Sequence, residues 1–240
     1  MERILILYDN RSYRETLRPG WGFSALIERG GKVALFDVGA DVLVFEHNAK
    51  ACGFDPKATD ALVLSHEHCD HIGAISAALH RKLDVYYPAS FSSQFEKEIW
   101  EEGRDPLWTP HPVTDPVEIA PGIHSTGELK GKNGIVEQGV IVETGEGPIL
   151  ITGCAHPGIV QMVEVATDIG SRCPQLVLGG FHLLGKKASE VQAIAAQLKQ
   201  LGVKQIAPCH CTGERATTVL REAFVGASIE VGVGTEIAIR

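Results

Sequence analysis

Apolar and polar positions alternate along the chain in two spacings, one typical of strands and one typical of helices. Short apolar runs bounded by polar or glycine residues predict strands. These are Arg3–Tyr8, Phe23–Arg29, Lys32–Val38, Ala61–Leu64, Leu83–Tyr87, Val140–Glu143, Pro148–Thr152, Gln175–Leu178 and Lys204–Ala207. Apolar residues that recur every three or four positions predict helices. These are Asp41–Cys52, a helix that ends at His80, Ile159–Ile169, Ser189–Leu201 and Glu214–Phe224. Strands followed by helices in both halves predict an α/β layered sandwich, with two sheets and helices packed outside them.

The pattern is weaker in two places. Between Pro88 and Pro121, prolines and glycines interrupt it, so we expect a short helix around Phe95–Trp100 and an irregular insertion. The last residues, Ile229–Ile239, predict a terminal β region. At the start of the helix Ser189–Leu201, Ser189 and Gln192 resemble a capping box.

Composition excludes several classes of protein. The 240 residues are 44% hydrophobic and 22% charged, which is the balance of a folded globular domain. The formal net charge of −8 argues against a surface that coats nucleic acid. No apolar run approaches the ~18 residues of a membrane span, and the charged N-terminal segment is not typical of a signal peptide. We therefore expect a cytoplasmic protein without a membrane or nucleic-acid partner; the sequence indicates no oligomeric state.

Cysteine and histidine residues lie close together in the sequence. Four of the six cysteines are within two residues of a histidine: Cys69, Cys154, Cys209 and Cys211. Without a secretion signal, six cysteines indicate reduced thiols and not a disulfide framework. These clusters follow predicted strands, and sites in α/β proteins gather at the carboxyl ends of strands. The sequence thus predicts one polar site assembled from distant segments.

The densest cluster is Ser65-His66-Glu67-His68-Cys69-Asp70-His71, directly after a buried strand. In an extended loop His66 and His68 project to the same side and can bind one ion. Asp70 and His71 then turn toward a second position as a helix begins. Imidazole suits zinc, iron and similar ions, and a carboxylate adds a harder oxygen ligand. Two ions would still lack ligands, which His156, His182 and His210 can supply.

Several of these residues also have an ordinary structural interpretation. A single histidine at a strand end is often a core or surface residue, and for His182 the two interpretations weigh equally. Asn10 can hydrogen-bond a heterocycle or a ligand phosphate, or can cap a turn. Trp21, Trp100 and Trp108 can stack on a planar ligand or simply pack.

The string from Ser65 to His71, continued by Ile72-Gly73, resembles the signature of the metallo-β-lactamase superfamily. This resemblance implies a single domain over residues 1–240 with a four-layer αβ/βα sandwich, in which helices flank two mixed sheets. It also implies a binuclear centre, with His66 and His68 in the first site and Asp70, His71 and His210 in the second. Asp70 would in addition hold the catalytic water.

A narrower resemblance covers nearly the whole chain. Its motifs are Asp9-Asn10, Gly22-Phe23-Ser24, Leu35-Phe36-Asp37-Val38-Gly39, Asn48-Ala49, Thr152–Val160, Gly179–Leu183 and Pro208–Gly213. They are similar to a branch named after 7,8-dihydropterin-6-methyl-4-(β-D-ribofuranosyl)aminobenzene-5′-phosphate synthase. Many members of that branch are described only as metal-dependent hydrolases.

The chain departs from the superfamily pattern at two positions. It has no Gly-His-Thr histidine before the strand at Pro148–Thr152, and the Gly-Asp that usually supplies a bridging carboxylate is Gly153-Cys154. One alignment places Cys154 at the bridging position, with His156 replacing the lost ligand. Another treats His156 as the third histidine and His182 as the replacement for the bridging aspartate. Cys154, His182 and Asn10 therefore stand as candidates for metal or substrate binding.

The resulting hypothesis is a metal-dependent hydrolase with two divalent ions that activate water against an anionic ester, phosphoester or related substrate. Zinc is favoured, since a thiolate at Cys154 prefers it to manganese, and iron or manganese is the alternative. The ions would attract a small anionic or heterocyclic substrate. One alternative is a dihydropterin transferase that uses the metals to assist pyrophosphate departure. An alternative of another class is a non-catalytic module that binds metal or pterin.

Overall fold

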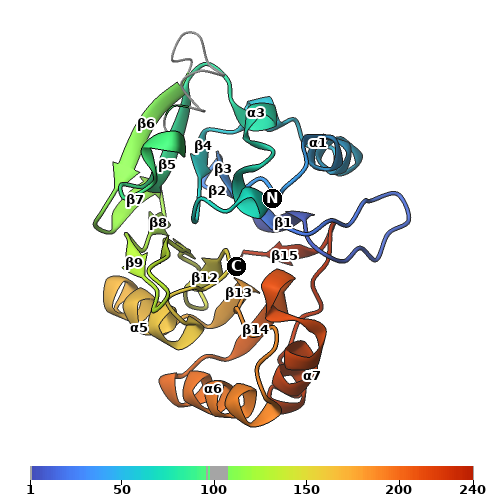
Figure 1. Ribbon diagram of the computed structural model, residues 1–240, viewed down its shortest axis with the longest axis vertical. Coiled ribbons are helices and arrows are strands. Elements are labelled where there is room, and N and C mark those ends of the chain that lie inside the picture. The colour runs from blue at the N-terminus through green and yellow to red at the C-terminus, as the bar shows by residue number, and fades with distance from the viewer. Residues whose placement is uncertain (1, 96, 98–107, 240) are drawn as a thin grey trace.

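The computed structural model describes residues 2–95, 97 and 108–239, which form two facing β-sheets with helices on their outer sides (Figure 1). The N-terminal half of the chain builds most of one sheet and its helices, and the C-terminal half builds the other. Both chain ends lie near the middle of the molecule in the view of Figure 1.

The first sheet has the strand order β15-β1-β2-β3-β4-β5-β6. Its strands are β1 (Arg3–Tyr8), β2 (Ser24–Arg29), β3 (Lys32–Phe36), β4 (Ala61–Val63), β5 (Leu83–Pro88), β6 (Trp108–Val113) and β15 (Glu236–Ala238). The strands from β15 to β3 pair antiparallel, whereas those from β3 to β6 pair parallel. The helices of this half are α1 (Val42–Ala51), η1 (Pro56–Ala58), α2 (Cys69–Ile72) and α3 (Ile75–Ala78).

The second sheet has the order β14-β13-β12-β11-β8-β7 and is also mixed. Its strands are β7 (Val117–Ala120), β8 (Ile123–Ser125), β11 (Val140–Val142), β12 (Ile149–Thr152), β13 (Leu176–Gly180) and β14 (Gln205–Cys209). Strands β12, β13 and β14 pair parallel, and the others pair antiparallel. The helices are α5 (Ile159–Gly170), α6 (Ala188–Leu201), η2 (His210–Thr212) and α7 (Glu214–Ala223), and a small ribbon contains β9 (Leu129–Lys130) and β10 (Val136–Glu137).

The core consists of three apolar layers, because successive side chains of a strand point to opposite faces. In β1, Ile4 and Ile6 pack between the two sheets, while Leu5 and Leu7 pack toward the helices of the first half. In β12, Leu150 faces the helices of the second half. Strands buried on both faces are continuously apolar, as the sequence pattern requires. The predicted four-layer αβ/βα sandwich of two mixed sheets is thus confirmed.

Most predicted strands and helices occur within one or two residues of their expected bounds, and the main errors lie in the weak region. The expected irregular insertion contains β6 and β7. Pro110 and Pro112 interrupt the apolar pattern of β6, so the sequence did not predict this strand. Among the described residues β6 is an edge strand of its sheet, where prolines are tolerated. The helix expected at Phe95–Trp100 falls largely outside the described residues.

Three smaller expectations were also wrong. The helix expected to end at His80 is two short helices, α2 and α3, since the chain turns at Gly73-Ala74. At the start of α6 the Glu190 side chain accepts a hydrogen bond from the backbone N–H of Lys187 (3.0 Å), and Ser189 lies inside the helix instead of capping it, because the helix begins one residue earlier than expected. The terminal β region is reduced to β15.

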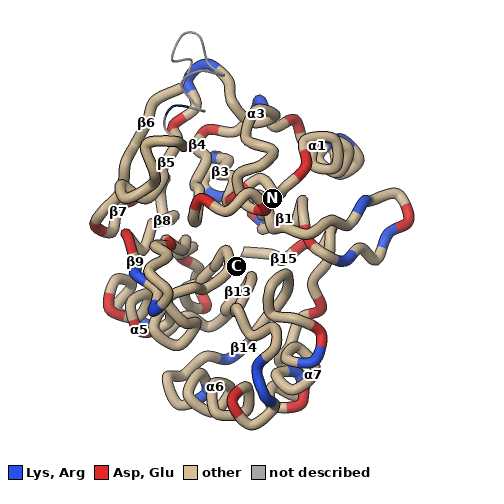
Figure 2. Tube along the Cα trace, in the orientation of Figure 1, with Lys and Arg blue, Asp and Glu red and all other residues tan. Residues whose placement is uncertain are grey.

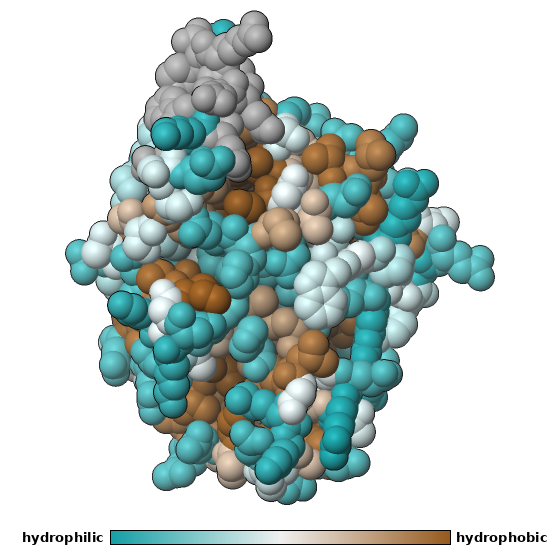
Figure 3. Space-filling model, in the orientation of Figure 1, coloured by the Kyte–Doolittle hydropathy of each residue, from teal (hydrophilic) through white to brown (hydrophobic). Residues whose placement is uncertain are grey.

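Neither one sign of charge nor one class of hydropathy dominates the surface of the described residues. Lys and Arg residues alternate with Asp and Glu residues on helices and loops (Figure 2). The face in Figure 3 is a mosaic of hydrophilic and hydrophobic areas. Among the described residues, no helix is both long and apolar enough to cross a membrane.

Candidate metal centre

The candidate donors lie on loops at the carboxyl ends of parallel strands, as the sequence predicted. The loop after β4 carries the string from His66 to His71, and the ends of β12, β13 and β14 lead into Cys154, His182 and His210. Because the carboxyl ends of parallel strands lie at one edge of a sheet, residues far apart in sequence meet there. The two sheets bring these edges together.

The first group of donors contains His66, His68 and His156. Nε2 of His66 lies 3.1 Å from Nδ1 of His68. The His156 ring lies 4.6 Å from the His66 ring and 5.0 Å from the His68 ring, measured between centroids. His66 and His156 are buried, whereas His68 is exposed.

The second group contains Asp70, His71 and His210. The Nε2 atoms of His71 and His210 lie 3.3 Å apart. Oδ2 of Asp70 is 3.3 Å from Nε2 of His210 and 3.8 Å from Nε2 of His71. These two histidines come from opposite halves of the chain, 139 residues apart.

Cys154 belongs to both groups. Its Sγ lies within 4.8 Å of the donor atoms of His66 and His156, and equally within 4.8 Å of those of His71 and His210. The Sγ to Nε2 distance to His71 is 3.3 Å. Of the two alignments that the sequence left open, this geometry matches the one with Cys154 between the groups. His182 lies to one side, with its ring centroid 4.6 Å from that of His156.

Four of the histidine rings follow one rule: Nδ1 faces an outer oxygen and Nε2 is directed inward, so in the tautomer that carries its proton on Nδ1 the Nε2 lone pair is free for an ion. His71 donates to Oδ2 of Asp37 (2.6 Å), and His156 donates to Oε2 of Glu137 (2.8 Å). His66 donates to Oγ of Ser65 (2.8 Å), and His210 donates to Oδ1 of Asn10 (3.1 Å). Such outer partners fix the tautomer and orientation of metal-binding imidazoles.

This arrangement tests whether the residues fit metal ions. The Nε2 atoms of His71 and His210 face each other at 3.3 Å, with the Asp70 carboxylate beside them, and an ion among these three groups would bind all of them. Burial, followed by the neighbouring histidines, holds the pKa of His66 well below its usual range, so the ring is neutral at pH 7. Despite burial, the neighbouring His210 and His71 rings hold the pKa of Asp70 below its usual range, so its carboxylate is ionised. Neutral imidazoles and an ionised carboxylate are the forms that bind divalent cations.

Two buried carboxylates support the donors. Asp37 accepts from the backbone N–H and the hydroxyl of Ser65, both at 2.7 Å, and also from His71. Burial raises the pKa of Asp37 despite these bonds. Glu137 accepts from the backbone N–H groups of Cys154, Ala155 and His156, at 2.8–2.9 Å, in addition to the His156 ring. For Glu137 the bonds outweigh burial and lower its pKa.

The backbone of the donor loops is strained. Asp37, Ala155, His182 and His210 all have positive φ, between 48° and 59°, a region that residues other than glycine rarely adopt. Such conformations cost about 1–3 kcal/mol each and cluster at functional sites. At Gly153 a Cβ atom would lie 2.2 Å from Oγ of Ser65, so only glycine lets the end of β12 pack against Ser65.

The sequence found most of the donors but missed supporting residues. Glu137 was not considered, and Asp37 was noticed only within a motif. For Asn10 the sequence left metal binding, substrate binding and turn capping open. In the structure Asn10 orients His210: its Oδ1 accepts from the His210 ring, and its Nδ2 donates to the His210 carbonyl oxygen (3.2 Å). The polar pair Glu137-Gln138 between the apolar runs Ile135-Val136 and Val140–Val142 was the available signal for Glu137.

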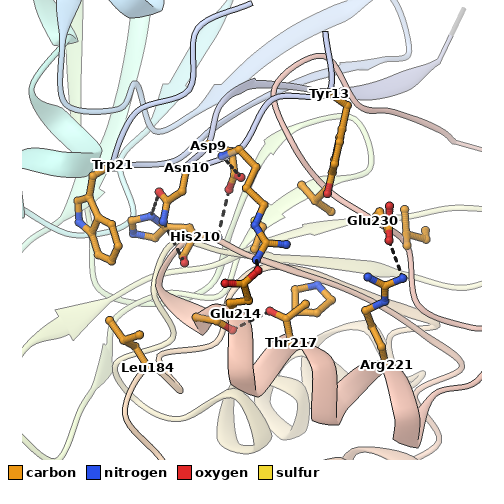
Figure 4. A pocket seen from close by; sticks show the side chains of 16 residues that line it. Asp9, Asn10, Tyr13, Trp21, Leu184, His210, Glu214, Thr217, Arg221 and Glu230 are labelled. Atoms are coloured by element: carbon orange, nitrogen blue, oxygen red, sulfur yellow. Dashed lines mark hydrogen bonds and ion pairs between the residues drawn. The ribbon is translucent and has the colours of Figure 1, made fainter.

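A cavity of about 250 Å³ adjoins the second group, and Figure 4 shows its lining. Trp21 stands beside the His210 ring, 5.1 Å away between centroids, and is 53% exposed. Leu184, 64% exposed, also lines the cavity. Arg11 and Arg221 line it too and form ion pairs with Glu214 and Glu230. A second cavity, of about 540 Å³, is lined by His68, Phe91 and Lys130 next to the first group.

Comparison with known proteins identifies the fold and the family of the chain. The chain is 30% identical to the 7,8-dihydropterin-6-methyl-4-(β-D-ribofuranosyl)-aminobenzene-5′-phosphate synthase of Methanocaldococcus jannaschii, over 85% of this chain and 84% of the relative. The crystal structure of Tm1679, described as a metal-dependent hydrolase of the β-lactamase superfamily, superposes with a TM-score of 0.82. It is 27% identical and covers 100% of this chain and 99% of its own. Human tRNase Z, short form, at 14% identity and a TM-score of 0.68, covers 99% of both chains and shares the fold. The family model described as the metallo-β-lactamase superfamily matches residues 17–182, and the chain belongs to that superfamily.

Proposed function

We propose that this chain is a metal-dependent hydrolase that holds two divalent ions. His66, His68 and His156 would bind the first ion, Asp70, His71 and His210 the second, and the Cys154 thiolate would lie between them. The observation that carries this proposal is that donor atoms from distant loops converge on Cys154, while the buried rings of His71 and His156 bind outer carboxylates through Nδ1 and direct Nε2 inward. A sulfur ligand and several imidazoles favour zinc over manganese.

The ions, when bound, lower the pKa of a water molecule to ~7 and polarise an ester or phosphoryl oxygen. The chain's own groups then orient the reactants. Asp70 is partly exposed and stays ionised, so it can accept a hydrogen bond from the attacking water. Asp37 and Asn10 hold His71 and His210 in place during turnover, because both rings are fixed through Nδ1.

The cavity beside His210 is the proposed substrate pocket. Trp21 and Leu184 offer exposed apolar surface to a flat ring, and a ring stacked on tryptophan gains binding energy beyond its buried area. Arg11 and Arg221 are available for an anionic group if it displaces the glutamates that pair with them. These features favour a small substrate with a heterocyclic part and an anionic ester or phosphoester.

A dihydropterin transferase is the second candidate. The sequence identity to a synthase from M. jannaschii favours it, and so does the presence of cavities next to both donor groups. A transferase must seat two organic reactants, whereas hydrolysis needs only one and water. In that case the ions would stabilise a departing pyrophosphate.

Turnover assays test both candidates. Zinc-loaded protein should hydrolyse bis-p-nitrophenyl phosphate, chelation should abolish turnover, and added zinc should restore it. His124→Ala is the control, since His124 pairs with Glu143 away from the centre. Pyrophosphate release that needs both a pterin diphosphate and an arylamine acceptor would establish the transferase instead. Tight binding of metal and pterin without any turnover would contradict both and leave a binding module.

A further inference from the structure

Three candidate donors lie together on one side of the two-ion centre. The two-ion centre uses Cys154 and leaves His182 and Cys211 unused. Sγ of Cys154, Sγ of Cys211 and a ring nitrogen of His182 are all within 4.8 Å of one another. They come from the ends of three adjacent parallel strands, β12, β13 and β14.

The spacing suits a tetrahedral ion. With Zn–S near 2.3 Å and Zn–N near 2.0–2.1 Å, ligand atoms of one zinc ion lie about 3.3–3.8 Å apart. Donors already within 4.8 Å of one another therefore need only small shifts to enclose an ion. Two sulfurs and one imidazole are a soft donor set that selects zinc or cadmium over manganese or magnesium.

The local structure holds Cys211 in this position. A Cβ atom at Gly180 would lie 2.6 Å from Sγ of Cys211, so the glycine leaves room for the thiol. The Cys211 thiol is also 3.5 Å from the carbonyl oxygen of Cys154. His182 takes a left-handed backbone conformation, with φ of 51°, and is exposed. Two donors are thus buried, and the third opens the position to solvent.

We propose that Cys154, His182 and Cys211 form a third metal position, which takes a soft divalent ion such as Zn²⁺ and leaves its fourth coordination site open to solvent. Cys154 is shared with the two-ion centre, so the three ions would form one cluster. This position adds a metal ion to the proposed hydrolase and does not depend on which reaction the enzyme catalyses.

Cadmium titration of the full chain under a thiol-free reductant tests the proposal. Cadmium stoichiometry and the ultraviolet band from thiolate-to-cadmium charge transfer are measured for the wild type and for Cys211→Ser. We expect three bound ions in the wild type and two in Cys211→Ser, with the band falling to about half because one of two thiolates is lost. His182→Ala should keep the band but weaken the third ion by at least ~10-fold.

The matched control is Cys209→Ser, which removes a buried thiol on the other side of His210 that is not part of the donor group. It should retain all three ions, and circular dichroism should show that every variant is folded. Two ions in both the wild type and Cys211→Ser would overturn the third position and leave the two-ion centre intact. If the wild type binds one ion and Cys211→Ser binds none, the result would support this position and contradict the two-ion centre.

Discussion

Two buried carboxylates, Asp37 beside the first sheet and Glu137 in the small β9–β10 ribbon, support the candidate centre, and they do so in different ways. Asp37 follows β3 of the first sheet and binds His71 directly and His66 through Ser65. It therefore supports one ring of each donor group. Glu137 ends β10, and among the described residues its carboxylate binds the loop of residues 154–156, so of the candidate rings it supports His156.

The pKa values of Asp37 and Glu137 shift in opposite directions, because the two carboxylates accept different sets of hydrogen bonds. Glu137 accepts three backbone N–H groups and a ring N–H, which together outweigh burial and lower its pKa. Asp37 accepts from a single residue, Ser65, and one ring, and burial prevails and raises its pKa. Loop geometry thus keeps Glu137 ionised, whereas Asp37 gains most from a positive charge nearby. A cation bound to His71 would supply that charge.

Asp37→Asn should have the largest effect. An amide accepts through one oxygen only, so its NH₂ group would face N–H or O–H donors of Ser65 or His71. We expect both ions to bind more weakly by ~10–100-fold each and hydrolysis to fall by about 10³-fold. Unfolding should become easier by about 1–3 kcal/mol. Metal competition with a chelator, kinetics and denaturant unfolding measure these three changes; weakening of one ion alone would contradict the shared role.

Glu137→Gln should weaken the first ion more than the second, which Glu137 supports only through the backbone of Cys154. The substitution loses the charge that binds the His156 ring, so affinity should fall by ~10–100-fold for the first ion. Calorimetric zinc titration resolves the two binding steps. Glu143→Gln is the matched control, because Glu143 binds the ring of His124 at 3.0 Å near the surface. Equal weakening of both steps in Glu137→Gln would remove the contrast with Asp37.

Asn10→Ala should affect the opposite ion more mildly. His210 loses the acceptor of its Nδ1–H but keeps the backbone bond from its own N–H to Asp9 (3.1 Å). We expect about 10-fold weaker binding of the second ion only. Asn10→Asp, which retains the acceptor oxygen, should restore most of the affinity in the same titration. If Asn10→Asp binds as weakly as Asn10→Ala, Asn10 does not act through the His210 ring.

Trp21→Ala should have the smallest effect and change neither ion. Loss of the stacking surface should raise KM for a heterocyclic substrate by ~3–10-fold while kcat stays near the wild-type value. Trp21→Phe keeps an aromatic face and should recover most of this loss. A fall in kcat with KM unchanged would place Trp21 outside substrate binding.

The fold and the donor string were predictable because their signals are local. Buried strands are continuous apolar runs, and His66-Glu67-His68-Cys69-Asp70-His71 collects ligand-type residues in one loop. His156 and His210 could be added because they follow predicted strands. The same reasoning failed at β6, whose prolines stand in the last strand of the first sheet and interrupt the apolar pattern.

The supporting carboxylates were much harder to predict. Glu137 lies in a two-residue strand, and the groups that it binds follow 17–19 residues later. Asp37 is 34 residues from His71. Each depends on tertiary packing, so neither leaves a periodic or clustered pattern in the sequence. The position of Cys154 between the groups likewise required the two sheets to be placed face to face.

Anomalous X-ray diffraction from crystals of the zinc-loaded protein, recorded on both sides of the zinc absorption edge, is the most direct measurement of this centre. We expect one zinc peak among His66, His68 and His156 and another among Asp70, His71 and His210. Each should lie about 2.3 Å from Sγ of Cys154. Zinc-loaded crystals without a peak at these two positions, or with Cys154 turned away from both, would contradict the account.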